Sequence, residues 1–173
     1  LIGHVGRFTQ QKNHDFLIDI FNEIHKINQN TKLLLIGTGI KENEIKEKVK
    51  SLNLQDSVIF EGFKTNVDEY MFAMDIFLFP SNFEGLGLVL IEAQAAGLPC
   101  YTSKDVVPTE AKVSNLLHYI SLNNPAQEWA KLIFSNSNCR LNVFKSIKDF
   151  GYDIEDTSLF LQKFYLRNGE NDE

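Results

Sequence analysis

The feature that most constrains this fold is a series of short, uninterrupted apolar runs. Two of them lie at residues 33–36 and 76–79 and consist entirely of apolar residues. They are too short for helices, and a strand that is apolar on both sides is typical of burial on both faces. Between such runs, apolar side chains recur with helical spacing, as at Phe16, Leu17, Ile20, Phe21, Ile24 and Ile27. This alternation predicts an α/β domain whose mostly parallel sheet is flanked by helices.

The same reasoning divides most of the chain into six strands and the helices between them. The predicted strands lie at residues 1–5, 32–36, 57–60, 75–79, 99–102 and 117–121. The predicted helices run from the cap at Asn13 to residue 27, over 41–52, 66–73 and 86–96, onward from Pro125, and over 157–166. A length of 173 residues suits one domain spanning residues 1–173.

Composition and charge exclude several classes of protein. The 23 acidic and 17 basic side chains leave a net charge of −6, which argues against a nucleic-acid-binding protein. No apolar stretch approaches the ~18 residues of a transmembrane helix. The two cysteines, Cys100 and Cys139, lie far apart and are expected to be reduced cytosolic thiols. Because the chain opens on a predicted strand without Met, we expect it to be a piece of a longer protein.

Ligands of parallel α/β sheets bind beyond the carboxyl ends of the strands, so the loops that follow strands are the candidate sites. The first of these loops carries two cations, Arg7 and Lys12. Arginine offers planar bidentate donors and lysine a point charge, a combination that suits phosphate oxygens. From spacing alone, two ordinary surface cations are an equally good interpretation. The loops in question span residues 6–13, 37–41, 61–66, 80–87 and 103–110.

The segment 84–92 is the most informative part of the chain. Its first four residues, Glu-Gly-Leu-Gly, end a strand and open a helix, where glycines allow close approach and free amides favour anions. Glu92 follows within a run of apolar and small residues, where a buried carboxylate would need a polar partner such as a pair of ligand hydroxyls. Taken alone, the segment rather favours an exposed polar stripe shared by Glu92 and Gln94.

Other motifs are weaker. Gly37 and Gly39 lack the third glycine of a dinucleotide-binding fingerprint and are typical of a plain turn. His4, at the end of a strand, is interpreted as a hydrogen-bonded structural residue. The remaining histidines show no metal-ligand spacing and the sequence has no Asp-x-Asp pair, so no metal is predicted at His14, His25 or His118.

Five motifs acquire a further meaning when they are taken together and in order. They are Val5-Gly6-Arg7-Phe8 with Lys12-Asn13-His14, Leu35-Ile36-Gly37-Thr38-Gly39, Val58-Ile59-Phe60-Glu61-Gly62-Phe63, Phe83-Glu84-Gly85-Leu86-Gly87 through Glu92, and Ala96-Gly97-Leu98-Pro99. The set resembles the C-terminal, donor-binding domain of GT-B glycosyltransferases of family 4, above all bacterial capsular and exopolysaccharide enzymes. The resemblance extends to about residue 120. It implies a Rossmann-like domain that forms one half of a GT-B fold, with the N-terminal acceptor domain outside this chain.

The resemblance implies the transfer of a sugar, with retention, from a nucleoside-diphosphate sugar such as a UDP-sugar. The acceptor would be a glycan or lipid-linked molecule in polysaccharide biosynthesis, and neither a metal nor another cofactor would take part. Glu84 would hold hydroxyls of the donor sugar, while Arg7 and Lys12 would neutralise the diphosphate. The resemblance places the donor and nucleotide contacts at Gly6, Gly37, Gly39, Phe63, Gly85, Leu86, Gly87, Leu88 and Glu92.

Within that set, Glu92 would accept hydrogen bonds from the ribose hydroxyls, and the amides of residues 86–88 would stabilise charge at the helix start. The backbone near Phe63 and Lys64 would contact the base. The loop 103–110 lacks glycines that many relatives have there, which leaves the role of Glu110 open.

Two alternatives stay open: a nucleotide-sugar epimerase of GT-B architecture, and a nucleotide-sugar-binding module without catalysis. For the leading interpretation we expect the domain to be inactive alone, because the active cleft of such an enzyme lies between two domains. The full-length enzyme would be cytoplasmic, at the inner face of the cell membrane and in peripheral contact with it. No nucleic-acid partner is expected.

Overall fold

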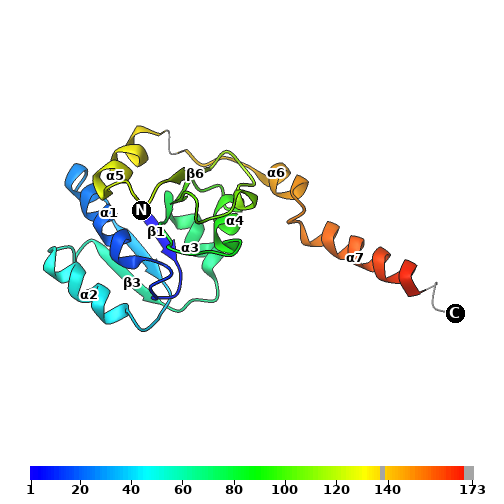
Figure 1. Cartoon of the computed structure of the whole chain (residues 1–173), viewed down its shortest axis with the longest axis horizontal. Helices are drawn as coiled ribbons and strands as arrows, with labels where there is room; N and C mark the ends of the chain where they lie inside the picture. The colour runs from blue at the N-terminus through cyan, green and yellow to red at the C-terminus, as the bar shows by residue number, and fades with distance from the viewer. Residues whose placement is uncertain (137–138, 170–173) are drawn as a thin grey trace.

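The computed structural model describes residues 1–136 and 139–169 and has a central sheet between two layers of helices (Figure 1). The strands are β1 (Ile2–Val5), β2 (Leu33–Ile36), β3 (Val58–Gly62), β4 (Ile76–Phe79), β5 (Cys100–Ser103) and β6 (Leu117–Ile120). The helices are α1 (His14–Ile27), α2 (Glu42–Ser51), α3 (Val67–Ala73), α4 (Leu88–Ala95), α5 (Ala126–Ser135), α6 (Phe144–Asp149) and α7 (Ile154–Gly169), and η1 (Thr109–Ala111) is a 3₁₀ turn.

The described strands form one six-stranded sheet in the order β3-β2-β1-β4-β5-β6, and every pairing is parallel. The predicted α/β class and its six strands are therefore confirmed. The first three strands extend the sheet in one direction and the last three in the other, so the direction of growth reverses between β1 and β4. Such a switch point opens a crevice between neighbouring loops, which is where ligands of this architecture bind.

Two apolar cores hold the helices on the sheet. Side chains of α1, α2 and α5 pack on one face, against strand residues such as Leu33 and Leu35. Side chains of α3 and α4 pack on the other face, against strand residues such as Leu34 and Phe77. Because successive side chains of a strand point to opposite faces, a fully apolar strand such as β2 serves both cores at once.

The starts of α4 and α7 differ from the prediction, since α7 begins at Ile154 rather than at residue 157, and so does the cap of α1. Helix α4 begins at Leu88 rather than at residue 86, because Gly87 adopts a left-handed conformation with φ 76°. Asn13 does precede α1, but its φ is 53° and its side chain does not cap the helix. Instead, its Nδ2 donates to the carbonyl of Pro80, 3.0 Å away, and so joins the loops after β1 and β4.

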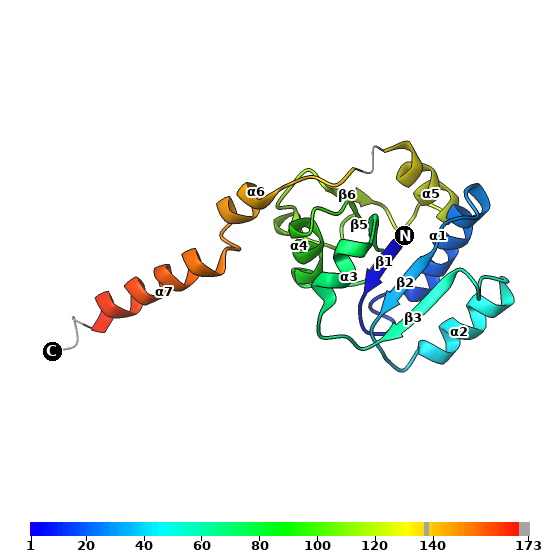
Figure 2. The ribbon, with the colours of Figure 1, turned by 180° about the vertical axis from the view of Figure 1, so that it is seen from behind.

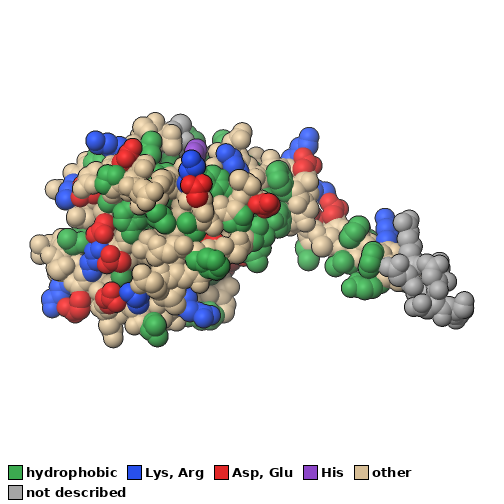
Figure 3. Space-filling model, viewed as in Figure 1, with side chains coloured by type: hydrophobic (Ala, Val, Ile, Leu, Met, Phe, Trp, Pro, Cys, Tyr) green, Lys and Arg blue, Asp and Glu red, His purple; other side chains and the backbone are tan. Residues whose placement is uncertain are grey.

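The C-terminal tail leaves the body of the domain and ends in α7 (Figures 1 and 2). Arg140 anchors the start of this tail through hydrogen bonds to carbonyls at the ends of α3 and α4. Many apolar side chains of α7 are exposed, and they form a green group on the projecting helix in Figure 3: Ile154, Leu159, Phe160, Leu161, Phe164, Tyr165 and Leu166. Within the described residues, no helix combines the length and the apolar character needed to span a membrane.

Candidate functional site

The loops after β1 and β4 are joined side by side at the switch point. Gln11 Nε2 donates to the carbonyl of Phe83 at 3.0 Å, and the amide of Asn82 donates to the carbonyl of Gln11 at 2.8 Å. Asn82 Nδ2 also donates to the carbonyl of Gln10, at 2.9 Å. These three hydrogen bonds hold the two loops side by side. Lys12 of the first loop is thereby brought to Glu84 of the second.

Lys12 and Glu84 form an ion pair at the centre of this arrangement. Lys12 Nζ lies 2.6 Å from Glu84 Oε1, and the side chains are only 17% and 6% exposed. The hydroxyl of Ser81 donates to the same oxygen at 2.8 Å. Lys12 Nζ also lies 4.6 Å from the centre of the Phe79 ring, close enough for a cation–π contact. Ser81 is a functional candidate that the sequence analysis missed, and no motif distinguishes it from the other serines.

Arg7 belongs to the same loop but has a different environment. Its side chain is exposed, and among residues 1–136 and 139–169 its guanidinium makes no ion pair. It is therefore free to bind an anion, whereas Lys12 is already engaged by a carboxylate. The two cations thus lie on the same loop, but only Lys12 contacts Glu84. Their role in binding a diphosphate stays a prediction.

Gly37 and Gly39 let the loop after β2 pack directly on the loop after β1. A Cβ added to Gly37 would lie 2.2 Å from the carbonyl oxygen of Gly6, and one added to Gly39 would lie 2.5 Å from that of Phe8. Gly37 also has φ 133°, a conformation that L-residues with side chains rarely adopt. These glycines therefore have a packing role. Their predicted contacts with a nucleotide, like that of Gly6, stay predictions.

Two buried histidines lie beneath the first loop. His4 Nδ1 lies 2.9 Å from the carbonyl of Leu78, in agreement with a structural role. The ring of His14 meets that of His4 edge-on at 4.6 Å and stacks on that of Phe8 at 4.0 Å. Burial, reinforced by the nearby charge of Lys12, lowers the pKa of His4 to about 4 and that of His14 to about 2. Both rings are therefore neutral at neutral pH, so the cationic charge of this loop comes from Arg7 and Lys12.

The start of α4 is open to ligands. Gly85 is exposed, and a Cβ added there would meet no atom within 4 Å. Gly87 turns the chain into the helix, and the exposed Leu88 is its first residue. The N-terminus of α4 thus follows directly from the segment that carries Glu84, and Leu86 lies half-buried between them.

The structure corrects the expectation for Glu92. Its side chain is exposed and therefore needs no buried partner, so the expectation of a buried carboxylate was wrong. It lines a groove of about 560 Å³ between α3 and α4, together with Asp68 and Phe72 among others. The alternative of an exposed stripe is confirmed for Glu92 but is wrong for Gln94. Gln94 is fully buried, and its Nε2 donates to the carbonyl of Ala111 at 2.8 Å.

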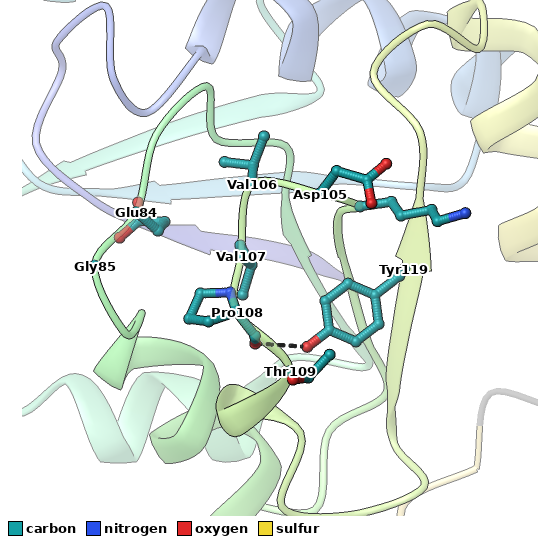
Figure 4. A pocket seen from close by; sticks show the side chains of 9 residues that line it. Glu84, Gly85, Asp105, Val106, Val107, Pro108, Thr109 and Tyr119 are labelled. Atoms are coloured by element: carbon teal, nitrogen blue, oxygen red, sulfur yellow. Dashed lines mark hydrogen bonds between the residues drawn. The ribbon is translucent and has the colours of Figure 1, made fainter.

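A second cavity has Glu84 in its wall (Figure 4). It measures about 530 Å³ and is lined by Glu84, Gly85, residues 104–109 and Tyr119. The hydroxyl of Tyr119 donates to the carbonyl of Pro108 at 2.9 Å, which ties β6 to the loop after β5. The loop 103–110, which departs from the family pattern in sequence, therefore forms a wall of the site. Glu110 is exposed in η1 and is not part of this wall.

The loop after β3 contributes an aromatic side chain at the same edge of the sheet. Phe63 is 74% exposed. Beside it, Lys64 Nζ lies 2.9 Å from Glu61 Oε2, and this contact holds the pKa of Glu61 below its ordinary value. In the described residues, no group of three or more His, Cys, Asp or Glu side chains is arranged to bind a metal.

Comparisons with known proteins agree with this arrangement. A family model described as "Glycosyl transferases group 1" matches residues 1–142. The putative glycosyltransferase EpsF of Bacillus subtilis is 33% identical over 99% of this chain and 46% of EpsF. The amylovoran biosynthesis glycosyltransferase AmsD of Erwinia amylovora is 39% identical over 55% of the chain and 26% of AmsD.

Among solved structures, HepE of Anabaena, crystallised in complex with UDP and glucose, superimposes with a TM-score of 0.76 at 18% identity. The alignment covers 96% of this chain and 47% of HepE, and it shows the shared fold. The chain spans less than half the length of each of these three proteins.

Proposed function

This chain belongs to the group 1 glycosyl transferase family and has the fold of one half of a GT-B enzyme, and from that premise we propose that it binds the sugar donor. The donor is a nucleoside-diphosphate sugar, with UDP as the first candidate because HepE holds UDP together with glucose. The whole enzyme transfers the sugar with retention, and without a metal, to a glycan or lipid-linked acceptor in polysaccharide biosynthesis. The names of EpsF and AmsD, both called glycosyltransferases, support the transfer of a sugar, and the name of AmsD adds a role in amylovoran biosynthesis.

The observation that carries this proposal is the ion pair of Lys12 with Glu84 at the sheet's switch point, in the segment that leads into the N-terminus of α4, with the exposed Arg7 on the same loop as Lys12. When the bond between the anomeric carbon and the diphosphate oxygen breaks, the diphosphate keeps the bonding electrons. Negative charge therefore grows on the diphosphate while the anomeric carbon becomes positive. Fixed cations and helix-terminal amides stabilise the first charge, and a carboxylate stabilises the second.

The groove between α3 and α4 and the cavity beside Glu84 suit the two ends of the donor. The groove between α3 and α4 takes the nucleoside, with Glu92 accepting hydrogen bonds from the ribose and the exposed ring of Phe63 near the base. The cavity beside Glu84 and Gly85 takes the sugar. The diphosphate then lies between them, across the N-terminus of α4 and against the cationic loop. Glu84 holds hydroxyls of the sugar as the bond to the diphosphate breaks.

Titration calorimetry with UDP, GDP and ADP on the full-length protein tests this proposal. We expect one of them to bind, and Lys12→Ala to weaken its binding about 10- to 100-fold, the range for loss of a charged contact. Lys26→Ala is the matched control, because Lys26 is exposed and pairs with Glu23 in the last turns of α1, at the end of that helix away from Lys12, and should leave affinity unchanged. The absence of binding by all three nucleotides at millimolar concentration, or equal effects of the two variants, would contradict the proposal.

Retention and metal independence have their own measurements. The anomeric configuration of the product, read by NMR, should match that of the donor. Turnover should persist at full rate in excess EDTA. An inverted product or a rate restored by added divalent ions would overturn that part of the proposal.

A further inference from the structure

The oxygen Oε1 of Glu84 accepts two hydrogen bonds, and the two donors have different strengths. Lys12 Nζ, at 2.6 Å, carries a full positive charge, whereas Ser81 Oγ, at 2.8 Å, is a neutral hydroxyl. Ser81 is completely buried and belongs to the same loop as Glu84, whereas Lys12 comes from the neighbouring loop. One donor is therefore fixed beside the carboxylate, and the other is the end of a long, flexible side chain.

The position of Lys12 creates a conflict with the role proposed for it. A lysine that neutralises a diphosphate must direct its ammonium toward phosphate oxygens, yet this ammonium is held by a carboxylate that is only 6% exposed. A buried carboxylate that loses its cation is strongly destabilised unless other groups donate hydrogen bonds to it. Ser81 is such a group, because it can remain on Glu84 when Lys12 moves.

We propose that a donor's diphosphate takes Lys12 from Glu84, and that Ser81 is the positioning residue that keeps Glu84 in place during this exchange. The inference rests on the proposed function and deepens it. Lys12 and Glu84 are then in contact while no donor is bound. When the diphosphate binds, Lys12 moves to it, and the Glu84 carboxylate can accept hydrogen bonds from the hydroxyls of the sugar. Recognition of the diphosphate and recognition of the sugar are thereby coupled through one lysine.

The exchange makes Glu84 a competitor of the nucleotide for Lys12. The variant Glu84→Gln keeps the shape of the side chain but removes its charge, so it should bind UDP about tenfold more tightly than the wild-type protein does. The gain should depend on Lys12. In the background Lys12→Met, adding Glu84→Gln should change the affinity for UDP by less than about twofold, because the effects of coupled residues are not additive.

Ser81 should act on UDP binding through Glu84. When the Ser81 hydroxyl is removed, Lys12 is the remaining donor to Glu84 Oε1 and is held there more strongly. Ser81→Ala should therefore weaken UDP binding about three- to tenfold. The same substitution in the Glu84→Gln background should leave the affinity for UDP unchanged. The single variant Ser81→Thr, which retains the hydroxyl, should bind UDP with the wild-type affinity. A residue that only packs would weaken binding equally in both backgrounds.

The experiment is calorimetry with UDP, or with whichever of GDP and ADP the wild-type protein prefers, on all of these variants in the full-length protein. Thermal unfolding of each variant identifies any that is misfolded, and the Lys12/Glu84 cycle decides the exchange without any variant of Ser81. A Glu84→Gln protein that binds no more tightly than the wild type would overturn the exchange. So would a gain that persists in Lys12→Met, because that result indicates plain repulsion between Glu84 and the phosphates. If the wild-type protein binds no nucleotide, the proposed function itself fails.

Discussion

At the scale of single residues, His4 and His14 make the stability of the domain sensitive to acid. Burial lowers their pKa values to about 4 and about 2, whereas an unfolded chain restores the ordinary value of 6.5. Below pH 6.5 the unfolded state therefore binds protons that the folded state does not. Their contribution to stability is complete above pH 6.5 and decreases as the pH falls, at up to about 1.4 kcal/mol per pH unit for each histidine.

The variant His14→Phe tests this pH dependence. Phenylalanine keeps the stacking on Phe8 and removes a base whose two ring nitrogens are buried without a hydrogen-bond partner. We expect the free energy of unfolding, measured with urea, to fall less steeply between pH 6.5 and 4.5 than in the wild-type protein. A slope equal to that of the wild type would contradict the prediction. His25→Gln is the control, because His25 is only partly buried and hydrogen-bonds to Thr31.

The residues of the site differ in how far the sequence could predict them. Lys12 and Glu84 could be placed together because each follows a buried strand, and parallel strands end at the same edge of the sheet. Glu92 could be placed only in part. The helix pattern favoured an exposed position for it, which the structure shows, but with apolar and small residues on all sides of α4 the sequence did not tell that Gln94 faces the interior. Ser81 was missed because its importance comes from a contact with Glu84 that appears only in three dimensions.

At the scale of elements, Arg140 joins three parts of the fold that are distant in sequence. Its guanidinium donates to the carbonyls of Met71, Phe72 and Met74 at the end of α3, and to that of Ala96 after α4. A cation at helix C-termini is favoured both by hydrogen bonding and by the helix dipole. The segment that leads to α6 is therefore held against both helices by one side chain.

Replacing Arg140 should weaken this junction. We expect Arg140→Ala to lower the free energy of unfolding by about 1–2 kcal/mol, the range for charged hydrogen bonds at partly buried helix ends. Lys145→Ala, an exposed cation on α6, serves as control and should have no measurable effect. Chemical denaturation of both variants checks the prediction. Equal free energies of unfolding for Arg140→Ala and Lys145→Ala would count against it.

The strands were predictable because their apolar runs are too short to form helices. The first residues of the helices were harder to predict. Gly87 adopts a left-handed conformation that shifts the start of α4, and the side chain of Asn13 bonds to Pro80 instead of capping α1. Both departures occur in the loops that build the site. Local sequence rules therefore failed where contacts between distant loops determine the backbone.

At the scale of the whole molecule, the body and the C-terminal tail have separate roles in stability. The described side chains of α7 are mostly exposed and belong to neither apolar core. An ion pair of 3.0 Å between Lys148 and Asp156 links α7 to α6 rather than to the sheet. Folding of the body therefore does not require α7.

Truncation after Gly151 tests this separation. We expect the melting temperature to stay within about 2 °C of that of the whole chain, because removing exposed residues changes stability by less than about 0.5 kcal/mol. The affinity for nucleotide should also be unchanged, and the loss of the exposed apolar side chains of α7 should reduce self-association in light scattering. A melting temperature that falls by more than about 5 °C would contradict the prediction.

The central place of β1 has a consequence for the folding of the chain during synthesis. Ile2 pairs with Leu33 on one side and with Ile76 on the other. The first three strands can therefore assemble as they leave the ribosome. The edge of β1 that pairs with β4 stays unpaired until β4 is translated. During that interval a growing chain offers an apolar, unpaired strand edge to its neighbours on the same messenger RNA. Slow translation of the segment before β4 should therefore lower the yield of native protein.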